Sequence, residues 1–411
     1  MSFAETVDFG SAPFQIIDGD RGKNYPKQDE FTDDGFCLFL NASNVTRNGF
    51  DFSQCQFITE QKDNVLRKGK LQREDVVLTT RGTIGNSAFY GESVPFENLR
   101  INSGMVILRC NQKEILPSYL YHFLRSPQFH GQVNSLRSGV AQPQLPIRDM
   151  RVIKLPLPAL HTQESIVSIL STYDNLIENN RRRIQLLEQA ARLLYKEWFV
   201  HLRFPGHEHV KIKDGVPEGW EKKKISDVCE TVGGGTPSTK ISEYWGGDIT
   251  WIVPSDVTKN DCLALLDSER KITEKGLRKS SAKMVPAETI FMTSRASVGF
   301  FALMDYDVCT NQGFINIIPH ENEMRMYLLF NLMSRVEEIR SNAKGTTYPE
   351  ISKGRFRGMK VVIPPNTLVN EFAEFPNDII RQVRTLKKSS LKLEKARDLL
   401  LPRLMNGEIP V

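Results

Sequence analysis

The residues best suited to chemistry in this 411-residue chain fall into three small groups. The glycine-rich stretch 231–239 (TVGGGTPST) has the composition of a phosphate-binding loop, but it lacks the G-K-[ST] ending of a P-loop and the spacing of a dinucleotide turn. Asp51 with the triplet 60–62 has the residue types of a magnesium nuclease site, yet the second half of the chain has no equivalent. His207 and His209 have no third His or Cys at a suitable spacing for a metal. We therefore expect no catalytic residues and no metal site.

Polar side chains on turn-rich loops favour a different chemistry, the recognition of nucleic acid. Arg, Asn and Gln can make bidentate contacts with base edges, whereas Lys, Ser and Thr suit phosphates. Any one such loop is more often an ordinary solvated loop, but here two similar sets occur, one in each half of the chain. The candidate DNA-binding residues are Lys23, Tyr25, Lys27, Asn44, Arg47, Arg81, Thr83, Arg137, Gln142, Gln144, Thr236, Ser238, Lys240, Lys259, Arg295, Lys344, Thr346 and Tyr348.

The composition is compatible with this interpretation without requiring it. Lys and Arg number 54 against 49 Asp and Glu, a net charge of +5, so a basic face could lie within a nearly balanced total. The six cysteines are scattered without a C-x-x-C pair, which is typical of a reducing compartment. With neither a signal sequence nor an apolar run of about 18 residues, we expect a cytoplasmic protein without a membrane span.

The elements that must position these loops are repeated at an offset of 206 residues. The helical phrase LLEQAARLLYKEWF at 186–199 recurs in outline as KLEKARDLLLPRLM at 392–405. Loop signals recur in the same order: TRGTIG at 80–85 matches SRASVG at 294–299. A coincidence of helical period would not also reproduce glycines, prolines and arginines between the helices, so the chain is a tandem duplication.

Each half consists of an α+β globule followed by a long helix. Short runs rich in β-formers, such as 76–80, 105–108 and 289–293, predict strands, and 117–129 with its counterpart 324–339 predicts helix. Apolar residues then follow a 3.5-residue period from Ile166 to Trp198, which predicts a helix too long to be stable without a partner.

The second long helix supplies that partner, and we predict an intramolecular coiled coil. Asn180 lies in the middle of the seam, where a polar residue fixes the register. Pro376 predicts a kink or break in the second helix, and Pro402 predicts fraying beyond it. The seam residues are Ile177, Asn180, Ile184, Leu187, Leu194, Val383, Leu386, Leu393 and Leu400.

The predicted fold is therefore α+β, with two similar recognition domains in tandem, separated by two long helices. The expected boundaries are 1–158 for the first recognition domain, 159–205 for the central helix, 206–366 for the second recognition domain and 367–411 for the C-terminal helix.

This order of parts resembles one family, the DNA specificity subunits of type I restriction–modification systems. The matching segments are LLEQAARLLYKEWFVHLRFPGHE (186–208), GVPEGW (215–220), GGGTPS (233–238) and LLLPRLMNGEI (399–409). The resemblance covers nearly the whole chain, although GVPEGW has no counterpart before the first domain.

The resemblance implies a non-catalytic subunit that recognises double-stranded DNA. Each recognition domain would read one half of an asymmetric, interrupted site. The two long helices would pack as an antiparallel coiled coil that acts as a spacer, so the α+β chain would be pseudo-two-fold symmetric. Two methyltransferase subunits would dock, one per half, and two restriction and motor subunits would complete the assembly. It also implies that S-adenosylmethionine, ATP and Mg²⁺ belong to those partner subunits.

Two other interpretations fit the same sequence. One is the recognition subunit of a related system in which methylation and cleavage share a fused partner chain. The other is a tandem protein-interaction scaffold without a DNA role. An enzyme with an unfamiliar active site is a third and weaker alternative.

Overall fold

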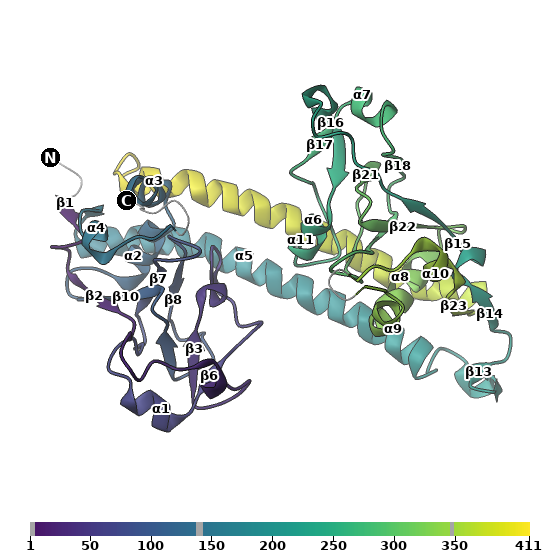
Figure 1. Ribbon diagram of the computed structural model, residues 1–411, viewed down its shortest axis with the longest axis horizontal. Coiled ribbons are helices and arrows are strands. Elements are labelled where there is room, and N and C mark those ends of the chain that lie inside the picture. The colour runs from purple at the N-terminus through teal and green to yellow at the C-terminus, as the bar shows by residue number, and fades with distance from the viewer. Residues whose placement is uncertain (1–4, 137–142, 346–348) are drawn as a thin grey trace. The chain divides into compact units, whose positions relative to one another are not determined.

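The computed structural model describes residues 5–136, 143–345 and 349–411. The chain divides into two compact units: the N-terminal unit comprises 1–177 with 392–411, and the C-terminal unit comprises 178–391. Figure 1 shows the two long helices, α5 (Leu160–Tyr195) and α11 (Asn366–Met405), each of which contributes residues to both units.

The N-terminal unit is built on a four-stranded antiparallel sheet of order β2-β10-β7-β8. Its strands are β2 (Phe14–Asp18), β10 (Met105–Cys110), β7 (Val76–Thr79) and β8 (Ser87–Phe89). The helices α2 (Pro117–Leu124), α3 (Pro127–Leu136) and α4 (Ile147–Met150) share one apolar core with β7 and β10. The predicted strands at 76–80 and 105–108 and the predicted helix at 117–129 are confirmed.

Smaller sheets complete the unit. β1 (Glu5–Asp8) pairs with β11 (Lys154–Leu157), and β4 (Val45–Thr46) pairs with β5 (Gly49–Phe50). The three-stranded sheet β6-β3-β9 combines β6 (Phe57–Ile58), β3 (Cys37–Leu40) and β9 (Leu99–Ile101), and α1 (Glu60–Val65) follows β6.

The C-terminal unit repeats this plan. Its four-stranded sheet has the order β15-β22-β19-β20, with β15 (Cys229–Gly233), β22 (Phe314–Pro319), β19 (Ile290–Thr293) and β20 (Phe301–Ala302). β14 (Glu221–Lys224) pairs with β23 (Lys360–Ile363), as β1 pairs with β11. The helices α8 (Met324–Ser334), α9 (Val336–Ser341) and α10 (Lys353–Gly358) lie in one core with β19 and β22.

The remaining strands of this unit form a sheet of order β17-β16-β21-β18 and a two-stranded sheet β12-β13. The bounds are β16 (Trp245–Ile252), β17 (Lys271–Ile272), β18 (Met284–Val285), β21 (Val308–Thr310), β12 (Ile212–Lys213) and β13 (Val216–Pro217). The short helices are α6 (Pro254–Thr258) and α7 (Glu274–Arg278).

The duplication extends to the pairing of individual residues. Asp18 lies opposite Val106 in the first sheet, and Gly233 lies opposite Ile315 at the equivalent place in the second. Leu40 pairs in parallel with Ile101, as Ile252 does with Thr310. A shift of one residue would move every side chain of a strand to the other face of its sheet. Because the register is the same, each unit presents the equivalent loops at the same end of its own sheet.

Each unit contains one end of an antiparallel helix pair, as predicted. In the C-terminal unit, Ile184 and Tyr195 of α5 share a buried core with Phe372 and Val383 of α11. In the N-terminal unit, the start of α5 and the last turns of α11 share another core. The other seam residues are buried (Asn180, Leu386) or half-buried (Ile177, Leu187, Leu194, Leu393, Leu400).

Of the kink or break predicted at Pro376, the break is wrong, because α11 continues through this residue to Met405. Proline in a helix interior loses one hydrogen bond and strains the preceding turn, at a cost of about 3 kcal/mol. The buried residues Phe372, Ile379 and Ile380 on either side fasten the helix to the core of the unit and offset that cost. The central helix also ends before residue 205: after Tyr195 it widens into a π turn, Lys196–Val200.

Candidate nucleic-acid interface

Three loops meet around a hollow at one end of the large sheet in the C-terminal unit. They are the start of α6, the turn after β19 and the turn before β22. The hollow has a volume of about 310 Å³ and is lined by Pro254, Ser255, Thr258, Arg295, Ala296, Ser297, Asn311, Gln312 and Gly313. Its lining includes the polar side chains of Ser255, Arg295 and Gln312, so it can accept a hydrogen-bonding group.

Hydrogen bonds hold these loops in a fixed geometry. The backbone N of Asn311 donates to Ile252 O at 2.9 Å, and the side-chain oxygen of Asn311 accepts from Gly313 N at 2.8 Å. The Ser294 N then donates to Gly313 O at 2.8 Å, which joins the turn after β19 to the turn before β22.

The N-terminal unit has the same arrangement at equivalent residues. Asn102 N donates to Leu40 O at 3.2 Å, the Asn102 side chain accepts from Gly104 N at 2.9 Å, and Thr80 N donates to Gly104 O at 2.8 Å. The loop after β7 even keeps the left-handed backbone of its counterpart, with φ of 72° at Gly82 and 60° at Ala296. Each unit therefore has the same hydrogen-bonded backbone arrangement of these three loops, which we call the frame. The side chains on the frame differ between the two units.

Several of the predicted DNA-binding residues lie together on this frame. Arg81 forms an isolated backbone bridge with Gln144, and Arg295 forms the equivalent bridge with Glu350, whose backbone also pairs with Lys344. The Arg295 guanidinium also lies 3.2 Å from the Glu350 carboxylate, but both side chains are about half exposed, so this ion pair contributes little and can open. The exposed predicted residues are Lys23, Lys27, Arg47, Arg81, Thr83, Ser238, Lys240, Lys259, Arg295 and Lys344.

Asn44 is not available to DNA, which corrects the prediction. Its side chain is buried, donates to the carbonyls of Asp51 at 2.9 Å and Gln54 at 2.7 Å, and accepts from Asn41 N at 3.0 Å. Asn and Asp often close turns in this way, and the sequence alone does not say which of them point inward.

Three further predicted residues are half-buried. The Tyr25 ring packs edge-on against Phe39 with 5.7 Å between centroids, so it belongs to the local core. Thr236 and Gln144 are the others. Arg137, Gln142, Thr346 and Tyr348 lie outside the described residues.

The loop that carries Lys23 and Lys27 is fixed by buried charges at its base. The Asp20 carboxylate accepts from Gly22 N at 2.7 Å and from Arg67 N at 2.8 Å, and these backbone hydrogen bonds lower the pKa of Asp20. Asp20 thereby joins this loop to the turn after α1, which bears the exposed cations Arg67 and Lys68.

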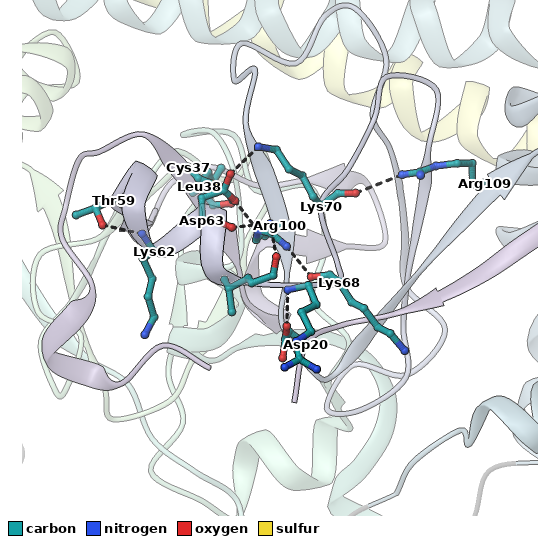
Figure 2. Close-up of polar contacts among 12 residues, drawn as sticks. Asp20, Cys37, Leu38, Thr59, Lys62, Asp63, Lys68, Lys70, Arg100 and Arg109 are labelled. Carbon is teal, nitrogen blue, oxygen red and sulfur yellow. Dashed lines mark hydrogen bonds and ion pairs between the residues drawn. The ribbon is translucent and has the colours of Figure 1, made fainter. Parts of the chain in front are cut away.

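A second carboxylate, Asp63, anchors α1 beneath that turn (Figure 2). Asp63 is fully buried between Arg100, with which it forms an ion pair, and Lys70, whose ammonium lies 2.5 Å away. Burial alone would raise the pKa of Asp63, but the hydrogen bonds from Lys70 and Arg100 hold it below its usual range. Arg100 also donates to the carbonyls of Lys68 at 2.6 Å and Leu66 at 3.2 Å.

The C-terminal unit has apolar packing at the equivalent position. Cys309 takes the place of Arg100 in the paired strands and lies in a cluster with Trp251, Ile272 and Ala282. The two frames are therefore alike, but the structures that support their outer loops differ. A buried ion pair stabilises the N-terminal unit there, and apolar packing stabilises the C-terminal unit.

The other chemical candidates are explained by local structure. The glycine-rich stretch packs inward, with Trp251 Nε1 donating to Gly235 O at 2.9 Å. Lys62 is paired with Glu30 at 2.8 Å, and His207 bonds its own turn through Phe204 O. Within residues 5–136, 143–345 and 349–411, no group of three His, Cys, Asp or Glu could hold a metal ion. No helix in these same ranges is long and apolar enough to cross a membrane.

Sequence reasoning missed the turn before the strands β10 and β22. Asn102-Ser103-Gly104 and Asn311-Gln312-Gly313 share the pattern N-x-G at equivalent places. Aligning the two halves at this tripeptide would have identified Ser103 and Gln312 as the variable residues on a common frame.

Comparison with known proteins gives one consistent family. The type I restriction modification DNA specificity domain matches residues 14–189 and again 217–395. The HindI specificity subunit of Haemophilus influenzae is 23% identical over 95% of this chain and 98% of its own length. The MjaIX specificity subunit of Methanocaldococcus jannaschii is 36% identical, but that alignment covers only 44% of each chain.

A solved structure supports the fold. The S subunit of a type I restriction-modification system from M. genitalium aligns over 97% of this chain and 95% of its own, with a TM-score of 0.56 and 14% sequence identity.

Proposed function

The chain belongs to the specificity subunits of type I restriction–modification systems, and on that premise we propose that each of its two units reads one half of a bipartite, asymmetric DNA site. The observation that carries the proposal is the repeated three-loop frame. A shared frame suits a shared task, binding to duplex DNA, and the different side chains on it suit two different half-site sequences.

Exposed cations around each frame supply the sequence-independent part of binding. Lys23, Lys27, Arg67 and Lys68 lie on the joined loops of the N-terminal unit, and Lys240, Lys259 and Lys344 are exposed in the C-terminal unit. Such residues neutralise phosphates and release counterions, so binding would weaken steeply with salt.

The long helices would set the distance between the half-sites. At 1.5 Å per residue, the 36 residues of α5 span about 54 Å. Because α5 and α11 contribute to both units, we propose that their common length fixes the gap in the site, while the loops fix the half-site sequences.

Partner subunits would supply the chemistry, and this chain would be non-catalytic. Leu193 of α5 and Leu399 of α11 are 52% and 71% exposed, and they occupy equivalent places in the 206-residue repeat. The same position of the repeat thus carries an exposed leucine in both copies, which suits the binding of two copies of one partner. We assign these places to two methyltransferase subunits carrying S-adenosylmethionine, with two restriction and motor subunits using ATP and Mg²⁺ in the cytoplasm.

The proposal is tested by DNA binding of the purified chain with its methyltransferase subunit. We expect a mobility shift on genomic fragments whose affinity falls by about 10³-fold or more between about 50 and 200 mM salt, as for proteins that contact several phosphates. The methyltransferase subunit alone is the control. A shift no greater than that control at about 50 mM salt would favour a protein-interaction scaffold instead.

A further inference from the structure

The two recognition frames differ at one pair of residues that touch each other. In both units the first large-sheet strand, β2 or β15, ends beside the N-x-G turn, and a glycine follows at Gly19 or Gly234. A Cβ on either glycine would collide with the backbone carbonyl of Asn102 or Asn311. Glycine is therefore required at both places, because the backbone passes against the turn.

Two residues after each glycine, a side chain contacts that turn. In the N-terminal unit, Arg21 donates to Ser103 O at 3.3 Å and to the Asp18 carboxylate at 3.1 Å. In the C-terminal unit, the Thr236 hydroxyl donates to the side-chain oxygen of Gln312. The pairs Arg21–Ser103 and Thr236–Gln312 thus occupy the same place on the common frame.

The two pairs offer hydrogen-bonding groups that match two different bases. Gln312 is exposed at the rim of the hollow, and a Gln side chain can accept from N6 and donate to N7 of adenine. The Arg21 side chain is 49% exposed, and a guanidinium can donate twice, to O6 and N7 of guanine. Neither Ser103 nor Thr236 has the two-pronged geometry needed for such a contact.

The partner in each pair fixes the orientation of the reader. Thr236 donates to the Gln312 side-chain oxygen, which retains a second lone pair for a base. Likewise, Asp18 and Ser103 O use only two of the five N–H donors of Arg21. Both arrangements restrict the side chain before DNA arrives, which lowers the entropy lost on binding.

Resting on the proposed function, we infer that Gln312 reads an adenine in one half-site and Arg21 a guanine in the other. The Thr236 hydroxyl positions Gln312, and the Asp18 carboxylate and the Ser103 carbonyl position Arg21. The specificity of each unit at this one base pair then depends chiefly on the residues at these two places, because the backbone beneath is the same; Asp18 adds a contact that Gly233, its counterpart in the second unit, does not make.

The test is the methylome of a host that expresses the full chain with its methyltransferase subunit. One variant carries the second pair in the first frame (Arg21→Thr with Ser103→Gln), and the other carries the first pair in the second frame (Thr236→Arg with Gln312→Ser). We expect one base in one half-site to change in each variant, from guanine to adenine or the reverse. The gap and the other half-site should be unchanged.

Single substitutions make the result independent of how well the exchanged pairs fit. Gln312→Ala should reduce discrimination at one base pair by about tenfold or more and leave the other bases read. Thr236→Val should relax the same base pair, and Thr236→Ser should restore it. Gln112→Ser and Asn322→Ser, exposed at the opposite ends of β10 and β22, are matched controls with the wild-type motif expected.

The outcomes separate the inference from its premise. A two-part wild-type motif that persists base for base in both exchanged chains overturns the inference, as does a uniform fall in methylation at an unchanged motif, which would indicate a role in folding or phosphate binding. Absence of any two-part motif in the wild type would overturn the proposed function itself.

Discussion

Asp63→Asn is expected to destabilise the N-terminal unit far more than any surface charge change. The Asp63 and Arg100 side chains are 1% and 5% exposed, so the substitution would leave a guanidinium buried without its counter-charge. Breaking a buried pair in this way typically costs about 3–5 kcal/mol. Lys70, the other partner of Asp63, is 43% exposed, and Lys70→Met should cost less than about 1 kcal/mol.

The effect should be confined to one unit, because the C-terminal unit has Cys309 and Trp251 where the N-terminal unit has this ion pair and Phe39. Hydrogen exchange followed peptide by peptide is a suitable assay. At about 1.4 kcal/mol per factor of ten, a loss of about 3–5 kcal/mol should lower protection in β3, β9 and α1 by about two to three and a half orders of magnitude. Peptides from β16 and β21 should keep their wild-type protection.

The pH dependence follows from the direction of the shift. The folded state holds the pKa of Asp63 below its unfolded value of about 4. The ion pair therefore contributes fully at pH 7, and its contribution is lost only as the pH falls below about 4, through the folded-state pKa.

Equal losses from Lys70→Met and Asp63→Asn would refute this reasoning, and so would unchanged protection in the peptides around α1. Replacing both partners, as in Asp63→Asn with Arg100→Met, should recover part of the loss. It should not recover all, because the carbonyls of Lys68 and Leu66 would lose their donor.

Three further predictions concern the helices and their surroundings. Burial lowers the pKa of His122 to about 4, so the unfolded chain binds the proton first and stability should fall by up to about 3 kcal/mol as the pH drops from about 6.5 to 4. Phe330 lies at the equivalent place in the other unit, because Tyr119 and Tyr327, three residues before each, donate to the equivalent carbonyls of Pro156 and Val362. His122→Phe should therefore keep the packing and reduce this dependence in calorimetric melts to the part due to His130, whose pKa burial also lowers. Inserting four residues after Asn180, with a matching insertion in α11, should lengthen the gap in methylated sites and leave both half-sites unaltered; altered half-sites at the old gap would contradict the spacer role. Leu193→Glu and Leu399→Glu should each remove one methyltransferase subunit from the complex in mass measurements, whereas retention of both copies would show that the subunits dock elsewhere.

The sequence predicted the features that rest on periodicity and repetition. The heptad spacing of Ile184 and Leu187 and the second copy at 392–405 were enough to predict two long helices that pack on each other, whereas their antiparallel direction was implied by the family resemblance. The α+β character of the two globules followed from short β-rich runs between turn signals. Such patterns are visible in the sequence because burying one face of a helix requires an apolar residue at about every turn, and burying one face of a strand requires one at every second residue.

The features that depend on the direction of single side chains were not predictable. Asn44 is of a residue type that can contact a base edge, but hydrogen bonds to the carbonyls of Asp51 and Gln54 hold its side chain inside the unit. Pro376 should end a helix by local rules, yet packing on both sides outweighs the lost hydrogen bond. The buried ion pair of Asp63 and Arg100 joins residues distant in the chain, and no spacing rule connects them.

The Arg21 and Gln312 sites show a third situation. Gln312 has a signal in the repeated N-x-G tripeptide, whereas Arg21 has no signal of its own in the sequence. Only the common frame, with Gly19 and Gly234 packed against the equivalent turns, shows that Arg21 corresponds to Thr236 and that each contacts the middle residue of its turn, Ser103 or Gln312. Comparison of the two halves in space therefore identifies candidate readers that comparison of the two halves in sequence left out.

The most direct measurement of the central claim is the methylome of a host expressing the wild-type chain with its methyltransferase subunit. If the two units read different half-sites and the helices set their spacing, one new methylated motif is expected, made of two different half-sites separated by a gap of constant length. A methylome identical to that of the host with the methyltransferase subunit alone, or a motif that is continuous or has a variable gap, would contradict it.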